Sequence, residues 1–277
     1  MPLLLGADPE LFVKTKIGLI SGHVFECGTK EKPMAVNSGF VQVDGMALEF
    51  NVTPAATRND FVKNTLSVLH DLEKIVKQKM PEASLEIIPV ADFGADYIKQ
   101  VPIEVSVLGC NPDYNAYTKG ENPAPNGELP FRTASGHIHI GFTDKADLND
   151  PGHLENCYAL VQEMDYMIGL PSLLWDRDNR RRELYGKAGA FRPKSYGLEY
   201  RVASNVWIKT TKTIEFVYDR TKTAAMRVFS ENKYGPCLHE RYGLLARDLI
   251  NSGDSEWPKK HPALAHMILS DREQIGA

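Results

Sequence analysis

The sequence predicts an α+β fold in which an antiparallel β-sheet carries helices on one side. Three observations lead to this class. Several short apolar or alternating runs follow one another with brief connections, strands and helices do not alternate regularly, and one long segment has clear helical periodicity. Short connections favour antiparallel pairing, and the irregular order argues against a parallel doubly wound sheet.

The first part of the chain is predicted to form a β-meander and then a helix. Short strands are expected at residues 3–13, 17–25, 36–43 and 46–52. Asp44-Gly45 is a tight-turn signal between the last two, and Asp44 is therefore interpreted as a turn residue. Residues 58–80 form the clearest helix, because apolar residues recur at helical spacing until Pro81 ends it.

The rest of the chain continues this mixed pattern. Further strands are expected at residues 84–91, 101–108, 133–142, 198–208 and 213–218. Asp150-Pro151 combines a capping residue with a first-turn proline, so a helix should run from there to about residue 168. Residues 111–130 are rich in Asn, Pro and Gly and predict a long loop, whereas residues 223–252 should be mostly helical with a break at Gly235-Pro236.

Composition excludes several classes of protein. Hydrophobic residues make up 43% and charged residues 25% of the 277 residues, as in an ordinary globular protein. The net charge of −4 gives no reason to expect a nucleic-acid partner. No apolar run reaches the roughly 18 residues of a membrane span, and residues 1–6 are too short for a signal peptide. The four cysteines are widely scattered, which suits reduced thiols in a cytoplasm.

Three distant segments carry functional groups at the same spacing. They are Asp8-Pro9-Glu10, His137-Ile138-His139 and Glu199-Tyr200-Arg201. In a β-strand, side chains two residues apart point to the same face, so each segment aims two groups into one space. Carboxylates, imidazoles and a guanidinium that converge in this way suggest hard metal ions holding a phosphate.

Each motif has a plainer interpretation as well. Asp8 and Glu10 taken alone suit the solvated edge of a strand, and Glu49 suits a solvated outward face. Two histidines on one strand face beside glycines favour a functional role, since histidine is the commonest metal ligand, but His-x-His also occurs in metallohydrolases. Residues 180–201 are dense in arginine and glycine and could cradle phosphate or form a basic surface loop. No Walker A or Rossmann glycine motif is present.

Taken in order, these motifs resemble those of the glutamine synthetase and γ-glutamylcysteine ligase superfamily, and more closely those of the phage-type carboxylate–amine ligases. The resemblance spans roughly residues 3–208. It is carried by Gly6-Ala7-Asp8-Pro9-Glu10, Leu108-Gly109-Cys110-Asn111-Pro112-Asp113, Gly136-His137-Ile138-His139-Ile140-Gly141 and Tyr196-Gly197-Leu198-Glu199-Tyr200-Arg201. It implies a curved antiparallel β-sheet funnel with helices on its outer face. Residues 1–277 are then expected to form one ligase domain, with a mostly helical C-terminal part at 223–277.

The resemblance also implies an activity and a set of ligands. The enzyme would use ATP and two or three Mg²⁺ ions, with Mn²⁺ as a substitute, to activate a carboxylate as an acyl phosphate and join it to an amine. The implied metal ligands are Asp8, Glu10, Glu49, His137 and Glu199. The implied nucleotide-binding residues are His139, Arg181, Arg192, Lys194 and Arg201, of which His139, Arg192 and Arg201 would act in catalysis.

The partners would be a nucleotide, a small-molecule or peptide carboxylate and an amine, with neither nucleic acid nor membrane. The location would be the cytoplasm, that of the host if the gene belongs to a phage. The oligomeric state stays open, because relatives of the glutamine synthetase type share sites between subunits. Two alternatives remain: a metal-dependent hydrolase built on the histidine strand, and a non-catalytic phage protein that retains the fold.

Overall fold

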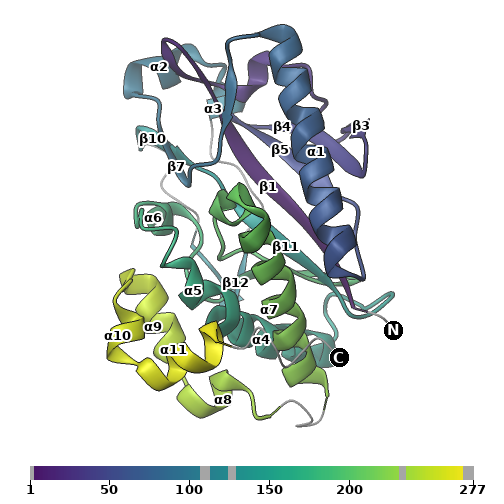
Figure 1. Cartoon of the computed structure of the whole chain (residues 1–277), viewed down its shortest axis with the longest axis vertical. Helices are drawn as coiled ribbons and strands as arrows, with labels where there is room; N and C mark the ends of the chain where they lie inside the picture. The colour runs from purple at the N-terminus through teal and green to yellow at the C-terminus, as the bar shows by residue number, and fades with distance from the viewer. Residues whose placement is uncertain (1–2, 107–112, 124–128, 231–234, 271–277) are drawn as a thin grey trace.

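A large antiparallel sheet organises the computed structural model, which describes residues 3–106, 113–123, 129–230 and 235–270 (Figure 1). Within these residues the sheet has eleven strands, with the order β3-β4-β5-β1-β11-β13-β12-β8-β9 and with β2 and β6 paired to β1. Every strand pair in it is antiparallel. The α+β class with an antiparallel sheet is thus confirmed.

The strands are short except for the first. They are β1 (Leu4–Thr15), β2 (Gly18–Ile20), β3 (Met34–Val36), β4 (Gly39–Asp44), β5 (Ala47–Val52), β6 (Ser84–Glu86), β8 (Tyr114–Asn115), β9 (Gly120–Glu121), β11 (Gly136–Gly141), β12 (Ala190–Lys194) and β13 (Gly197–Tyr200). A separate two-stranded sheet pairs β7 (Val90–Asp92) with β10 (Phe131–Thr133).

Three long helices lie on the sheet's outer face, and shorter ones complete the fold. The long helices are α1 (Arg58–Lys79), α4 (Pro151–Met164) and α7 (Thr211–Phe229). The shorter ones are η1 (Gly22–Val24), α2 (Ala95–Gln100), α3 (Ile103–Ser106), η2 (Asp165–Gly169), α5 (Leu170–Ser172), α6 (Arg181–Leu184), η3 (Asn205–Lys209), α8 (Leu238–Tyr242), α9 (Leu245–Ser252), α10 (Trp257–Lys260) and α11 (Pro262–Leu269). None of the helices in the described ranges is both long and apolar enough to cross a bilayer.

Alternation along the central strands separates the core from the site. Leu5, Ala7 and Leu11 of β1 belong to the main hydrophobic core, as do Ile138 of β11 and Leu198 of β13. The residues between them in sequence point to the other face, because successive side chains of a strand alternate. The apolar face is covered by helices: α1 contacts β4 and β5, α4 contacts β12 and β13, and α7 packs against both helices (Figure 1). The polar face is left for the site.

Two predicted strands are helical instead. Residues 213–218 lie within α7, where Thr210 and Thr213 form a reciprocal capping box at the start of the helix. Ile214 and Val217 of this segment are buried at helical spacing. Residues 103–106 form α3, so the strand predicted at 101–108 is wrong over its described part. The strand predicted at 198–208 ends at Tyr200 and is followed by the 3₁₀ helix η3.

Position 197, at the start of β13, requires glycine. Its φ is +147°, and a Cβ there would lie 2.0 Å from the backbone oxygen of Ile140. We expect Gly197→Ala to lower the free energy of unfolding by about 3 kcal/mol, because neighbouring backbone has to move. Gly120→Ala is the matched control, since its nearest atom would be 4.0 Å away. Urea denaturation of both variants tests this, and equal losses of stability would contradict it.

Candidate functional site

The register of the central strands brings the predicted site residues into adjacent rows. Asp8 of β1 lies opposite His137 of β11, and Glu10 lies opposite Glu49 of β5. On the next strands, Glu199 of β13 lies between His139 and Arg192. Directly opposed residues in an antiparallel pair project from the same face. Residues from five parts of the chain therefore share the polar face of one sheet.

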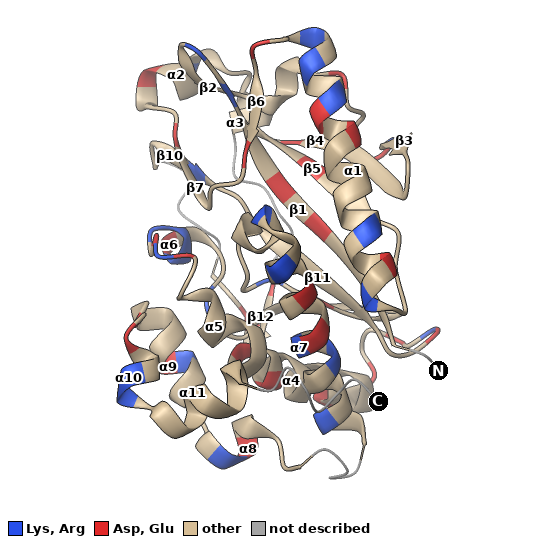
Figure 2. Cartoon of the chain, in the orientation of Figure 1, with Lys and Arg blue, Asp and Glu red and all other residues tan. Residues whose placement is uncertain are grey.

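This face forms one wall of a cleft of about 1000 Å³. Eight of the predicted site residues line the cleft: Asp8, Glu10, Glu49, His137, Arg192, Lys194, Glu199 and Arg201. Figure 2 shows acidic residues on β1, the long strand in the middle of the sheet. The cleft is rich in charge of both signs, which sets it apart from an apolar ligand pocket.

The first cluster in the cleft consists of Asp8, His137 and Glu199. Nδ1 of His137 lies 3.2 Å from Oδ1 of Asp8 and 3.5 Å from Oε1 of Glu199. One donor atom from each residue lies within 4.8 Å of the others, a spacing that could hold a metal ion. Nε2 of His137 is buried and has no hydrogen-bond partner among the described residues.

The second cluster consists of Glu10, Asp44 and Glu49 and also has its donor atoms within 4.8 Å of one another. Asp44 ends β4 at the predicted turn, but its carboxylate belongs to this cluster too, so its interpretation as a turn residue alone is incomplete. Neighbours orient the carboxylates. Gln42 donates to Oε1 of Glu49 at 2.8 Å, the backbone N–H of Ser135 donates to Oε2 of Glu10 at 2.7 Å, and Lys30 pairs with Asp44 at 2.7 Å.

Three cations surround the carboxylate of Glu199. Nζ of Lys194 lies 2.8 Å from Oε2, a guanidinium nitrogen of Arg192 lies 3.7 Å from Oε1, and Arg201 donates to Oε1 at close range. Arg201 also lies 3.5 Å from Asp113. Glu199 is only 2% exposed, so these charges interact with little screening by water.

Charge neighbours hold two of the acids in their ionised form. Burial raises the pKa of Asp8, but His139 and His137 outweigh this effect and hold it well below its usual value. Burial and Asp8 likewise raise the pKa of Glu199, whereas His137, Arg201 and His139 lower it to a net value of about 2. The cluster nearest the cations is therefore anionic at neutral pH.

The pKa values of Glu10 and Glu49 are shifted in the opposite direction, upwards. Burial, followed by repulsion from Asp44, raises the pKa of Glu10 to about 8. Burial and the charges of Asp8 and Asp44 raise the pKa of Glu49 well above its usual value. The second cluster thus has more acidic groups than the surrounding protein can neutralise.

The two histidines differ in environment. Burial, followed by Arg201, lowers the pKa of His137, so its imidazole is neutral and suits a metal ligand. His139 is not among the described residues that line the cleft, but it lies beside one of them: its Nε2 is 3.1 Å from Asp8, and its Nδ1 is paired with the hydroxyl of Tyr196. Burial opposes protonation of His139, but Asp8 outweighs it and raises the pKa. Tyr196 belongs to the sequence motif at residues 196–201, but the spacing of that motif did not indicate that Tyr196 would contact His139.

Arg181 does not join the cleft. Its guanidinium is 1% exposed and donates to the backbone oxygens of Val202 at 2.7 Å and Ala203 at 2.9 Å and to the hydroxyl of Ser135 at 3.1 Å. These acceptors hold the two terminal nitrogens of the guanidinium, so Arg181 braces the segment after β13, and it is not among the described residues that line the cleft. The motif at residues 108–113 lies outside the described residues except for Asp113.

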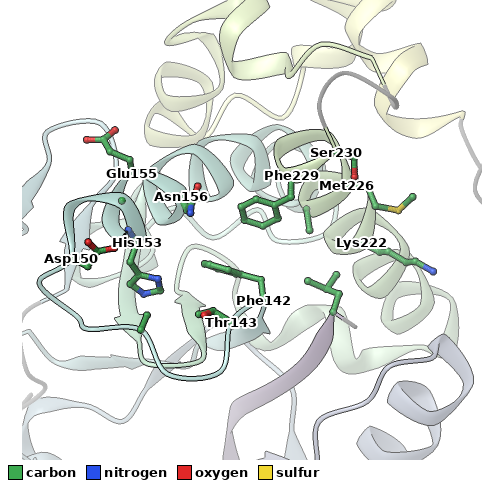
Figure 3. A pocket seen from close by; sticks show the side chains of 14 residues that line it. Phe142, Thr143, Asp150, His153, Glu155, Asn156, Lys222, Met226, Phe229 and Ser230 are labelled. Carbon is green, nitrogen blue, oxygen red and sulfur yellow. Dashed lines mark hydrogen bonds between the residues drawn. The ribbon is translucent and has the colours of Figure 1, made fainter. Parts of the chain in front are cut away.

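A second cavity, of about 1040 Å³, lies between α4 and α7 (Figure 3). Phe142 and Phe229 face each other there with ring centroids 4.9 Å apart. Its acids have structural partners: Asp150 caps the backbone N–H of His153 at 2.8 Å, and Glu155 pairs with Lys119 at 2.7 Å. None of the three metal-like clusters found in the described residues lies in this cavity. The cleft is therefore the stronger candidate for the active site.

A comparison with protein families agrees with the motifs. Residues 126–233, less than half of the chain, match the family described as phage phiEco32-like COOH·NH2 ligase, type 2. This match confirms the predicted resemblance and indicates a carboxylate–amine ligase. The matched segment contains β11, β12 and β13, which carry the histidine pair, Arg192, Lys194 and Glu199, and it also contains Arg201 directly after β13. No curated protein matches the chain.

Proposed function

We propose that this chain, matched over residues 126–233 to a carboxylate–amine ligase family, is an ATP- and Mg²⁺-dependent ligase that forms an amide through an acyl phosphate. One observation carries the proposal. Two clusters whose donor atoms could each hold a metal ion lie in a single cleft, and three cations that pair with Glu199 line the same cleft. Phosphoryl transfer needs this combination, because positioning and neutralisation of charge supply most of its catalysis.

The donor sets fit divalent cations. Glu10, Asp44 and Glu49 offer only carboxylate oxygens, which Mg²⁺ prefers. Asp8, Glu199 and His137, whose Nδ1 faces both carboxylates, would hold a second ion, and this mixed set also suits Mn²⁺. The bound cations would withdraw charge from the phosphate oxygens of ATP and draw the clustered carboxylates together.

The reaction would proceed in two steps. An oxygen of the substrate carboxylate attacks the γ-phosphorus, the bond from that phosphorus to the bridging oxygen breaks, and ADP leaves. The amine nitrogen then attacks the acyl carbon, the carbon–oxygen bond to phosphate breaks, and inorganic phosphate and a proton leave. Arg192, Lys194 and Arg201 would hold the transferred phosphoryl group, and His139, which lies beside Asp8, would contact it.

A hydrolase is a weaker candidate. Metal-dependent hydrolases of the His-x-His type use further histidines, and His137 is the sole histidine among the described residues that line the cleft. A hydrolase also has no need for three cations beside the metal ligands. We further propose that residues 1–277 act as one ligase domain. Because the reaction consumes ATP, it would take place in the cytoplasm, that of the host for a phage-encoded enzyme.

Calorimetry of ATP binding tests the proposal. We expect Mg²⁺ to tighten ATP binding by about tenfold or more, because otherwise the triphosphate would face the acidic residues of both clusters without a cation between them. The titration is run on the full chain with Mg²⁺ and with EDTA, and AMP serves as the control nucleotide because it lacks the β- and γ-phosphates. Equal affinities with and without Mg²⁺ would favour a non-catalytic protein.

A further inference from the structure

A third group of donors lies in the helical layer, away from the cleft. Glu163 of α4, Cys237 and His239 of α8 bring one ligand atom each to within 4.8 Å of one another. Glu163 is fully buried, and Cys237 is a buried free thiol with 8% exposure. None of the three lines the cleft, so the proposed ligase reaction gives them no role.

The carboxylate of Glu163 is only half satisfied. Its Oε2 accepts a hydrogen bond from the backbone N–H of His239 at 3.1 Å and lies 3.0 Å from Nδ1 of the same residue. Its Oε1 is buried and has no hydrogen-bond partner within the described ranges. A buried carboxylate oxygen without a partner is costly, so this atom calls for a ligand.

We infer that Glu163, Cys237 and His239 form a site for Zn²⁺. Thiolate, imidazole and carboxylate are the three donor types of protein zinc sites, and three protein ligands leave the fourth position of the tetrahedron for water. Zinc binds these atoms at about 2.0 to 2.3 Å, so the side chains must close around the ion. Binding forms the sulfur–zinc bond, and the thiol proton leaves to solvent.

The site has a defined structural consequence. Glu163 lies near the end of α4, a helix that packs directly against β12 and β13. Cys237 and His239 belong to the beginning of the C-terminal group of short helices. An ion shared by these residues would fasten that group to the helix beneath the catalytic strands. The simpler alternative is that Glu163 only accepts hydrogen bonds from α8.

Cobalt substitution distinguishes these alternatives. Cobalt is added to the full chain after removal of metal with a chelator, and the near-ultraviolet band of thiolate-to-cobalt charge transfer is recorded. No cysteine in the described part of the chain lines the cleft, so a band that is lost in Cys237→Ser comes from the proposed site. Variants Cys237→Ser and His239→Gln remove one donor each, and Cys27→Ala removes a buried free cysteine elsewhere as the control.

We expect the band to appear at one equivalent of cobalt, to disappear when Zn²⁺ is added, and to persist in Cys27→Ala. It should be absent in Cys237→Ser and weakened in His239→Gln. Zn²⁺ should also raise the melting temperature of the wild-type chain more than that of Cys237→Ser. The absence of a band in the folded wild-type chain, or a band of full strength in Cys237→Ser, would overturn the zinc site without affecting the ligase proposal.

Discussion

The variant Glu199→Gln is expected to reduce ATP-dependent ligation, measured as ADP release, by about 1000-fold. Glu199 belongs to the cluster with Asp8 and His137, and its carboxylate also pairs with Lys194 and Arg201. Glutamine keeps the size of the side chain but removes the charge that would bind a cation and balance Lys194 and Arg201. Alanine would also leave a cavity at a position that is only 2% exposed, so glutamine is the sharper change.

Two controls separate chemistry from folding in this experiment. Glu155→Gln removes an exposed glutamate that pairs with Lys119, and we expect its rate to stay within about twofold of wild type. Far-ultraviolet circular dichroism of Glu199→Gln should match that of the wild type. A wild-type rate of ADP release in Glu199→Gln would exclude this residue from the active site.

The variant Asp44→Asn is expected to lower the rate by about 100-fold and to raise the Mg²⁺ concentration needed for half-maximal activity. Asparagine suits the turn between β4 and β5 as well as aspartate does. The substitution therefore preserves the turn and removes only a charge from the cluster with Glu10 and Glu49. The loss of rate should be partly recovered at high Mg²⁺, because weakened binding can be offset by concentration.

The measurement is a Mg²⁺ titration of ADP release for the wild type and for Asp44→Asn. Asp147→Asn serves as the matched control, since Asp147 accepts from the backbone N–H of Asn149 in a surface turn. If Asp44→Asn and Asp147→Asn behave alike, Asp44 acts only as a turn residue and the second cluster does not hold a catalytic ion.

The shared face of the two functional groups in each motif was predictable, because strand alternation is a local property. Asp8, His137 and Glu199 are each followed two residues later by a second functional group. In a strand the two side chains of such a pair lie on one face, whichever strands lie next to it. The pairing of β1 with β11 and of β11 with β13 joins segments more than fifty residues apart, and local pattern carries no record of that register. The resemblance to the ligases supplied the order that spacing alone could not.

The local pattern did not indicate where the side chains of two residues lie, and both cases have physical causes. Asp44 has a complete local explanation as a turn residue, and its place in a cluster depends on the hairpin lying beside β1. Arg181 stands in an arginine-rich run that suggested phosphate binding, but burial turned its guanidinium towards backbone carbonyls. The positions of both side chains depend on tertiary packing, which the neighbouring sequence does not reveal.

Anomalous scattering from crystals grown with Mn²⁺ and a non-hydrolysable ATP analogue tests the central claim most directly. We expect one manganese peak among Asp8, His137 and Glu199, another among Glu10, Asp44 and Glu49, and the triphosphate between these ions and Arg192, Lys194 and Arg201. Manganese and nucleotide bound outside this cleft, with both clusters empty at saturating concentrations, would contradict the account.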